Sequence, residues 1–266
     1  MMHPEQITNQ VKELVQETGK YILQEWSKLT SENVQSKGLH DFVTHVDTAS
    51  EKQLVKGLKK ILPQAGFIVE EETIHKKGEE YNWIVDPLDG TTNYIHGITP
   101  FAISIALSKN DQIISGVVYE LGFNELFEAW EGAPARMNGK EIRVSQVSSI
   151  KESIVATGFP YNDFSRLKAY LGSLEHFMRN THGIRRFGSA ATDLCYIACG
   201  RFEAFYEYSL KPYDVAAGSF IVRQAGGRVS DFSGGDRYIF NQEMVAASDQ
   251  VFDAFLATIK DYLQPA

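Results

Sequence analysis

Cysteine is nearly absent from this sequence of 266 residues. Only Cys195 and Cys199 occur, and two thiols four residues apart give no disulfide framework, so a reducing cytoplasm is the simplest expectation. If the segment is helical, the two thiols share one face and could form part of a metal site. We favour a plainer interpretation, in which both are small buried apolar side chains.

The sequence also lacks a long apolar run and an excess of basic residues. No run approaches the roughly 18 residues that indicate a transmembrane helix, and we expect no signal peptide, because no basic segment precedes an apolar core. The 26 Lys and Arg residues face 34 Asp and Glu, a net charge of −8. This balance argues against nucleic acid and anionic membranes as partners, since both require a basic surface.

Several familiar site patterns are missing too. No Walker A sequence and no GxGxxG motif follows a strand, so nucleoside triphosphate and dinucleotide sites lack support. The EF-hand spacing is absent, the seven histidines are scattered, and no G-x-S-x-G elbow marks a serine nucleophile. A Ser-His-Asp triad stays open, because its members need not be close in sequence.

The first half of the chain has clear periodic patterns. Apolar residues at helical spacing predict helices over 7–22 and 48–62. Thr48 and Glu51 have the spacing of a capping box at the start of the second helix. Strand-like runs separated by turns over 98–131 predict an antiparallel meander.

The second half alternates between helix and strand. The expected elements are a helix over 167–178 capped by Ser165, a helix over 190–199, a strand over 202–208, a helix capped by Asp214, and a last helix over 252–259. No linker separates the halves. We therefore expect an α+β (mixed α/β) fold in one domain, 1–266, which could consist of two layered subdomains at about 1–150 and 151–266.

The most informative segment is Asp86-Pro-Leu-Asp-Gly-Thr-Thr-Asn93, which follows a short apolar run. Two carboxylates three residues apart at a strand end can ligate a hard cation such as Mg²⁺, which prefers oxygen ligands. Gly90 permits a sharp turn, and the N–H groups after it could bind phosphate where a helix begins. Acids beside an anion-binding turn indicate a cation between them, and hence metal-assisted phosphate chemistry.

Further acids lie at strand ends or helix starts, where functional loops gather: Asp47, Glu70 with Glu71, and Asp214. Each has a plain alternative. Asp47 and Asp214 could do no more than cap helices, and the glutamates could form a solvated turn. The central motif is harder to explain in that way.

Five blocks resemble segments of the inositol monophosphatase family and follow one another along the chain as they do in the family. Three correspond to its signature blocks: Phe67–Glu71, Trp83–Tyr94 and Tyr213–Gly218. Two weaker blocks also fit, Asp41–Asp47 and Gly188–Ala191. The resemblance implies a layered αβαβα sandwich, dependence on two or three Mg²⁺ ions, inhibition by Li⁺ and commonly a homodimer. Tyr213 departs from the family pattern, which usually has Trp there.

Carried over residue by residue, the resemblance implies three sets of site residues. The metal ligands would be Glu70, Asp86, Asp89, Asp214 and the Leu88 carbonyl. The phosphate or the substrate alcohol would contact Asp89, Gly90, Thr91, Ala190, Glu207 and Asp214. Accessory positions near the site would be Lys37, Asp47 and Glu71.

These residues predict hydrolysis of a small phosphate monoester such as inositol 1-phosphate. A divalent cation makes water a better nucleophile at pH 7, Glu70 with Thr91 would take or relay the proton, and Asp86 would bridge two ions. NADP(H), fructose 1,6-bisphosphate and 3′-phosphoadenosine 5′-phosphate stay open as substrates. A different class also stays open: a non-catalytic interaction protein with this fold that binds a partner such as the transcription machinery.

Overall fold

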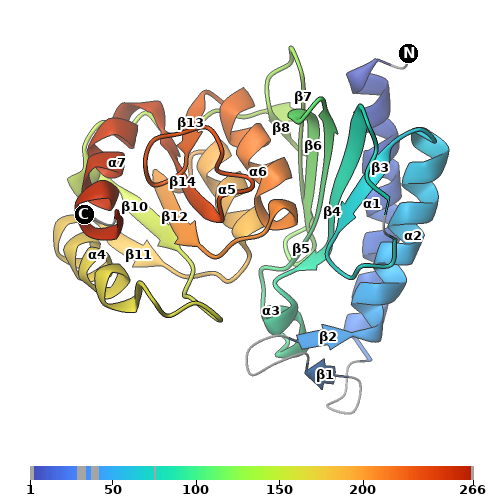
Figure 1. Ribbon diagram of the computed structural model, residues 1–266, viewed down its shortest axis with the longest axis horizontal. Helices are drawn as coiled ribbons and strands as arrows, with labels where there is room; N and C mark the ends of the chain where they lie inside the picture. Colours follow the sequence, from blue (N-terminus) through green and yellow to red (C-terminus); the bar gives the residue numbers. More distant parts are fainter. Residues whose placement is uncertain (1–2, 29–33, 37–41, 75, 265–266) are drawn as a thin grey trace.

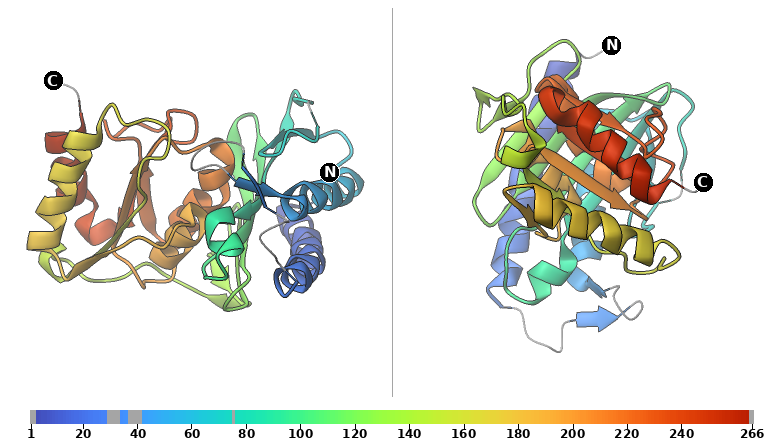
Figure 2. Two further views of the ribbon diagram at one scale, coloured as in Figure 1. Left: turned by 90° about the horizontal axis from the view of Figure 1, so that it is seen from below. Right: turned by 90° about the vertical axis from the view of Figure 1, so that its left-hand side faces the viewer.

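The computed structural model describes residues 3–28, 34–36, 42–74 and 76–264. Helices and sheets alternate in five layers, seen edge-on in the left view of Figure 2. Two helices cover the outer face of a large sheet, two helices lie between the large and a small sheet, and two more cover the small sheet from outside (Figure 1). The expected α+β (mixed α/β), αβαβα sandwich is confirmed.

The first layer consists of α1 (Pro4–Trp26) and α2 (His45–Ile61). A stripe of apolar residues on α1, which includes Val11 and Val15, is buried against α2 and the large sheet, and each such side chain contributes about 1.5–3 kcal/mol. The predicted start of α2 at a Thr48–Glu51 capping box is wrong. The helix begins at His45, and Glu51 does not cap it. The buried Glu51 carboxylate instead accepts the N–H groups of Glu71 and Thr73, in the loop after the first strand of the large sheet.

The large sheet contains the predicted meander. Its order is β3 (Gly66–Val69), β4 (Tyr81–Asp89), β5 (Ala102–Lys109), β6 (Gln112–Glu120), β7 (Glu125–Trp130), β8 (Arg136–Met137) and β9 (Lys140–Glu141). Only β3 and β4 pair in parallel among these described strands. The β4–β5 register shifts between Asp86 and Asp89, because Pro87 has no N–H for the ladder. This irregularity places the two acids at the strand end.

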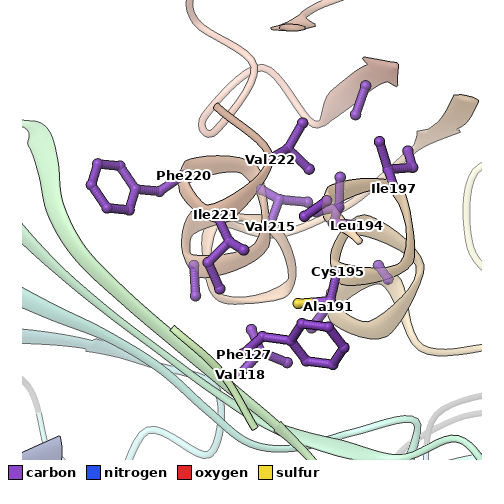
Figure 3. Packing of buried hydrophobic residues seen from close by; sticks show 14 of the residues in the cluster. Val118, Phe127, Ala191, Leu194, Cys195, Ile197, Val215, Phe220, Ile221 and Val222 are labelled. Atoms are coloured by element: carbon purple, nitrogen blue, oxygen red, sulfur yellow. The ribbon is translucent and has the colours of Figure 1, made fainter. Parts of the chain in front are cut away.

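The central layer consists of α5 (Ala190–Ala198) and α6 (Pro212–Gln224), which contact both sheets. Figure 3 shows how apolar side chains of both helices meet Val118 and Phe127 of the large sheet. Gly116 on β6 permits a close approach, since a Cβ there would come within 2.9 Å of the Ala217 carbonyl oxygen. Cys195 is fully buried in this cluster, as the plainer interpretation predicts, and burial raises the pKa of its thiol well above the usual value. Cys199 is only partly buried at the edge of the same cluster.

The small sheet has the order β11 (Gly183–Arg185), β10 (Ile154–Thr157), β12 (Ala204–Tyr208), β14 (Glu243–Ser248) and β13 (Gly227–Ser230). Outside it lie α4 (Leu167–Asn180) and α7 (Asp249–Leu263), whose apolar faces form a third cluster with the sheet. The predicted cap of α4 at Ser165 is wrong: Arg166 precedes the helix, and the Ser165 N–H donates to the Asp163 carboxylate.

Short elements complete the fold: β1 (Val34–Ser36) pairs with β2 (Phe42–Thr44), α3 (Thr91–Ile95) follows the central motif, and a 3-10 turn spans Ile150–Glu152. Across the described ranges, none of the helices has the length and apolar character that crossing a bilayer requires.

Candidate active site

A cavity of about 240 Å³ opens between the end of β4 in the large sheet and the loops that enter α5 and α6. Four carboxylates line it, and each comes from a different element. Glu70 directly follows β3, Asp89 ends β4, Glu207 lies on β12, and Asp214 is in the first turn of α6. The fold therefore brings together acids that are up to 144 residues apart in sequence, from Glu70 to Asp214.

Glu70 lies beside Asp86, which is almost completely buried behind the cavity wall. Burial raises the pKa of both carboxyl groups well above the usual values, and the charges of Asp214 and other acids add to this, while the hydrogen bond with Asp86 partly offsets the pKa shift of Glu70. Asp86 Oδ1 accepts the Leu88 N–H at 2.9 Å. Glu70 Oε2 is buried and has no hydrogen-bond partner among the described residues.

Asp89 is held at the start of α5. Its Oδ2 accepts the Ser189 hydroxyl at 2.6 Å and the Ala191 N–H at 2.8 Å. Burial raises the pKa of Asp89 to about 6, although these hydrogen bonds and the charge of Arg186 lower it. These hydrogen bonds fix the Asp89 carboxylate in the lining of the cavity.

Asp214 has both a structural role and a place in the cavity. The prediction that it is the N-cap of its helix is wrong, because α6 begins at Pro212 and Asp214 is its third residue. Its Oδ2 reaches back and accepts the Lys211 N–H at 2.6 Å. Burial, and then the charge of Asp89, raise the pKa of Asp214 to about 7.

Glu207 and Ala190 line the side of the cavity formed by the small sheet and α5. Glu207 is buried, and burial followed by the charge of Asp214 raises its pKa well above the usual value. Gly158 makes room for this side chain, since a Cβ at that position would clash with the Glu207 carboxylate.

A tight turn connects β4 to α3. Gly90 has a φ of +88° and leaves no space for a side chain, because a Cβ would lie 3.0 Å from the Pro100 carbonyl oxygen and 3.2 Å from that of Gly188. Asn93 donates to the carbonyl oxygens of Pro100 and Phe187, at 2.8 and 2.6 Å. Gly90 and Asn93 thus fix this turn against the segment that enters α5.

The Thr91 hydroxyl lies within hydrogen-bond distance of two acceptors, the Leu88 carbonyl oxygen at 3.0 Å and Asp47 Oδ1 at 3.1 Å. Asp47 is fully buried in the first turn of α2. Because the single hydroxyl hydrogen is directed toward these oxygens, the lone pairs of the hydroxyl stay available to accept a hydrogen bond from a molecule in the cavity.

The remaining predicted positions lie behind the cavity or outside the described residues. Asp47, Glu71 and Leu88 do not line it, and Leu88 is fully buried. Lys37 belongs to the residues that the structure does not describe. Sequence reasoning missed two cations that do line the cavity, Arg186 and Lys211. Neither belongs to a residue pattern that could have indicated them.

The oxygen-rich lining fits a hard cation. Within the described ranges, no three Asp, Glu, His or Cys side chains are gathered closely enough to enclose a metal ion by themselves. Mg²⁺ does not need such an enclosure, because it usually keeps several waters and takes one or two carboxylates plus a substrate phosphate. The unpaired Glu70 Oε2 and the mutual repulsion of the buried acids are the features that a divalent cation would relieve.

The chain is similar to known proteins over nearly its whole length. The chain is 38% identical over 253 residues to the Nus factor SuhB of Pseudomonas aeruginosa, covering 93% of each protein. The crystal structure of extragenic suppressor protein suhB from Bartonella henselae matches with a TM-score of 0.88 at 36% identity, over 95% of this chain and 97% of that one. An IMPase from Thermotoga maritima matches with a TM-score of 0.87 at 33% identity, over 97% and 98%.

The family model described as inositol monophosphatase family matches residues 3–264. With relatives of this similarity over nearly the whole chain, the protein belongs to the inositol monophosphatase family.

Proposed function

We propose that the protein is a Mg²⁺-dependent phosphomonoesterase that hydrolyses inositol 1-phosphate or a similar small phosphate ester. The observation that carries this proposal is the meeting of four carboxylates from separate elements in one cavity, beside the turn at Gly90 and Thr91. Membership of the inositol monophosphatase family supports it. The open Glu70 oxygen and the raised pKa values of the acids are further support, because a cation would relieve both.

In this proposal the acids and one carbonyl hold two or three Mg²⁺ ions: Glu70, Asp86, Asp89, Asp214 and Leu88. When bound, these ions neutralise the phosphate charge and lower the pKa of water. The N–H groups of Gly90 and Thr91 hold phosphate oxygens. The Glu70 carboxylate oxygen that does not bind a cation takes the proton of the attacking water, and the Thr91 hydroxyl, which donates toward Asp47, accepts a hydrogen bond from the same water.

The substrate alcohol would lie toward the small sheet. Glu207 and Asp89 would accept hydrogen bonds from its hydroxyl groups, and Ala190 would contact its ring or carbon chain. A polyol such as inositol suits carboxylates that line a cavity, because each hydroxyl supplies one donor. NADP(H), fructose 1,6-bisphosphate and 3′-phosphoadenosine 5′-phosphate are alternative substrates of the same chemistry.

A substrate panel tests the proposal. Phosphate release would be measured from inositol 1-phosphate and the three alternatives, in Mg²⁺, in a chelator, and in Mg²⁺ with Li⁺. We expect Mg²⁺-dependent release that Li⁺ inhibits, and loss of release in Asp86→Asn. Asp261→Asn, which removes an exposed carboxylate from α7, is the matched control. No release from any ester by well-folded protein would contradict the proposal.

A second candidate is suggested by the relatives. Two proteins named Nus factor SuhB are 37% and 38% identical to this chain over 100% and 93% of its length. We therefore also propose a role in transcription through binding of RNA polymerase or its factors. The Asp86→Asn variant separates the two functions. If it binds purified RNA polymerase as wild type does while releasing no phosphate, the binding role is independent of catalysis.

We further propose, from the family resemblance, that the protein works as a homodimer in the cytoplasm. Light scattering of the purified protein at micromolar concentration tests the first point, and a monomeric mass would contradict it.

A further inference from the structure

Arg186 is a cation that the proposed chemistry does not use. It lies between β11 and α5, lines the cavity and is half-buried. Within the described part of the chain its guanidinium makes no hydrogen bond and no ion pair, and its Nε is buried without a partner. A buried charged donor without an acceptor is costly. A ligand in the cavity could supply the missing acceptor.

The guanidinium is nevertheless held in place. It lies over the rings of Phe159 and Tyr161, with centroid distances of 5.5 and 5.4 Å, and both rings belong to the loop after β10. Gly188 gives it room, since a Cβ there would clash with Arg186 Nη1. Two cation–π contacts and one glycine therefore position a forked donor at the cavity without using up its N–H groups.

A second cation lines the same cavity. Lys211 precedes α6, its side chain is exposed, and it forms no ion pair with any described residue. Arg186 and Lys211 both come from connections of the small sheet, β11 to α5 and β12 to α6, whereas the turn at Gly90 and Thr91 ends a strand of the large sheet. The cavity thus has an anion-binding turn on one sheet and two unpaired cations on connections of the other.

We propose that Arg186 and Lys211 form a subsite for a second phosphate group of the substrate. This inference rests on the proposed hydrolase function and extends it: the preferred substrate is a small ester with two phosphate groups, one at the turn and one at the cations. Arg186 contributes two parallel N–H donors to phosphate oxygens, and Lys211 contributes a point charge. Neither cation takes part in the hydrolytic step.

Two other roles for Arg186 make different predictions. It could bind the phosphate that is hydrolysed, in which case its loss would weaken all substrates equally. It could also hold the loop of Phe159 and Tyr161 in place, or offset the nearby buried acids, whose pKa values its charge lowers. With a purely structural role of this kind, loss of Arg186 would likewise affect ligands with one phosphate group and ligands with two equally.

The experiment compares ligands that differ only in the second phosphate. Binding of fructose 1-phosphate and fructose 1,6-bisphosphate would be measured by calorimetry with Ca²⁺ in place of Mg²⁺, and kcat/KM for both would be measured with Mg²⁺. The proteins are wild type, Arg186→Gln, Arg186→Lys and Lys211→Gln. Arg185→Gln is the matched control, because it removes the neighbouring charge from an exposed side chain that does not line the cavity.

We expect wild type to prefer the bisphosphate and Arg186→Gln to reduce that preference by roughly tenfold to a hundredfold, the range for a charged hydrogen bond. Arg186→Lys should keep part of the preference for the bisphosphate. Lys211→Gln should reduce this preference less than Arg186→Gln does, and Arg185→Gln should leave the preference unchanged. Equal affinity of wild type for both ligands, or an equal loss for both in Arg186→Gln, would overturn the subsite. Because binding is measured without turnover, absence of hydrolysis would count against the hydrolase function alone.

Discussion

Protonation and Mg²⁺ should control the stability of this protein through Asp214. The pKa of Asp214 in the folded protein is raised from 3.8 to about 7. An acid with a raised folded-state pKa stabilises the fold below its unfolded pKa and loses that contribution as pH rises through the folded value. Metal-free protein should therefore lose stability between about pH 4 and pH 8. Replacing this acid by a neutral side chain should remove the part of the loss that comes from Asp214, while the other buried acids of the cavity, whose pKa values are also raised, keep their own parts.

The size of the effect follows from the shift. One pKa unit corresponds to about 1.4 kcal/mol, and Asp214 is half-buried, so we take roughly 3 kcal/mol after allowing for solvent screening. For a chain of this length 1 kcal/mol moves the Tm by about 2–4 °C. Asp214→Asn should thus raise the Tm of metal-free protein at pH 8 by the order of 10 °C and change it little near pH 4.5. Asn can still accept the Lys211 N–H.

The assay is thermal unfolding from pH 4.5 to pH 8, in chelator and in Mg²⁺. At 100 times its Kd, Mg²⁺ should stabilise wild type at pH 8 by about 2.7 kcal/mol, and it should stabilise Asp214→Asn less. Asp261→Asn on the outer helix α7 serves as the control and should follow wild type. The reasoning is refuted if wild type without metal is as stable at pH 8 as Asp214→Asn, or if Mg²⁺ stabilises the two equally.

Three further substitutions test individual parts of the site. Asp86→Asn should lower kcat by several orders of magnitude while circular dichroism stays unchanged, and a near-normal rate would refute its bridging role. Thr91→Val should lower kcat by about a hundredfold and Thr91→Ser should restore most of it, whereas equal rates in the two variants would exclude the hydroxyl. Gly158→Ala should displace the Glu207 carboxylate, and we expect KM to rise by about ten times the factor by which kcat falls. An unchanged KM would place Glu207 away from the substrate.

Local patterns sufficed for most of the fold. Alternating apolar residues and turn signals predicted the meander of β5, β6 and β7, and helical spacing predicted α1 and α5, since these elements bury one regular face. Helix starts were predicted less well. Thr48 and Glu51 have the spacing of a capping box, but Glu51 instead binds N–H groups of the loop after β3, a contact between segments that local spacing cannot indicate.

The site residues, too, fall into those that local sequence could predict and those that it could not. The segment from Asp86 to Asn93 carries its chemistry in consecutive residues, so it could be recognised, and family resemblance then indicated Glu207 and Ala190. Arg186 and Lys211 could not be found, because a single cation in a loop has no periodicity or partner nearby in sequence. The two cations reach the cavity only because the loop after β10, the β11–α5 connection and the β12–α6 connection meet there in the folded chain. The roles assigned to the individual site residues stay predictions until variants are measured.

The most direct test of the account is a crystal structure in Mn²⁺, which occupies Mg²⁺ sites and is located by anomalous scattering. The account predicts an anomalous peak within about 2.5 Å of the Asp86 carboxylate, with Glu70 on one side and Asp89 and Asp214 on the other. The account would be contradicted if no peak appeared at this position at millimolar Mn²⁺ while these four acids, Glu70, Asp86, Asp89 and Asp214, were ordered and paired to protein groups.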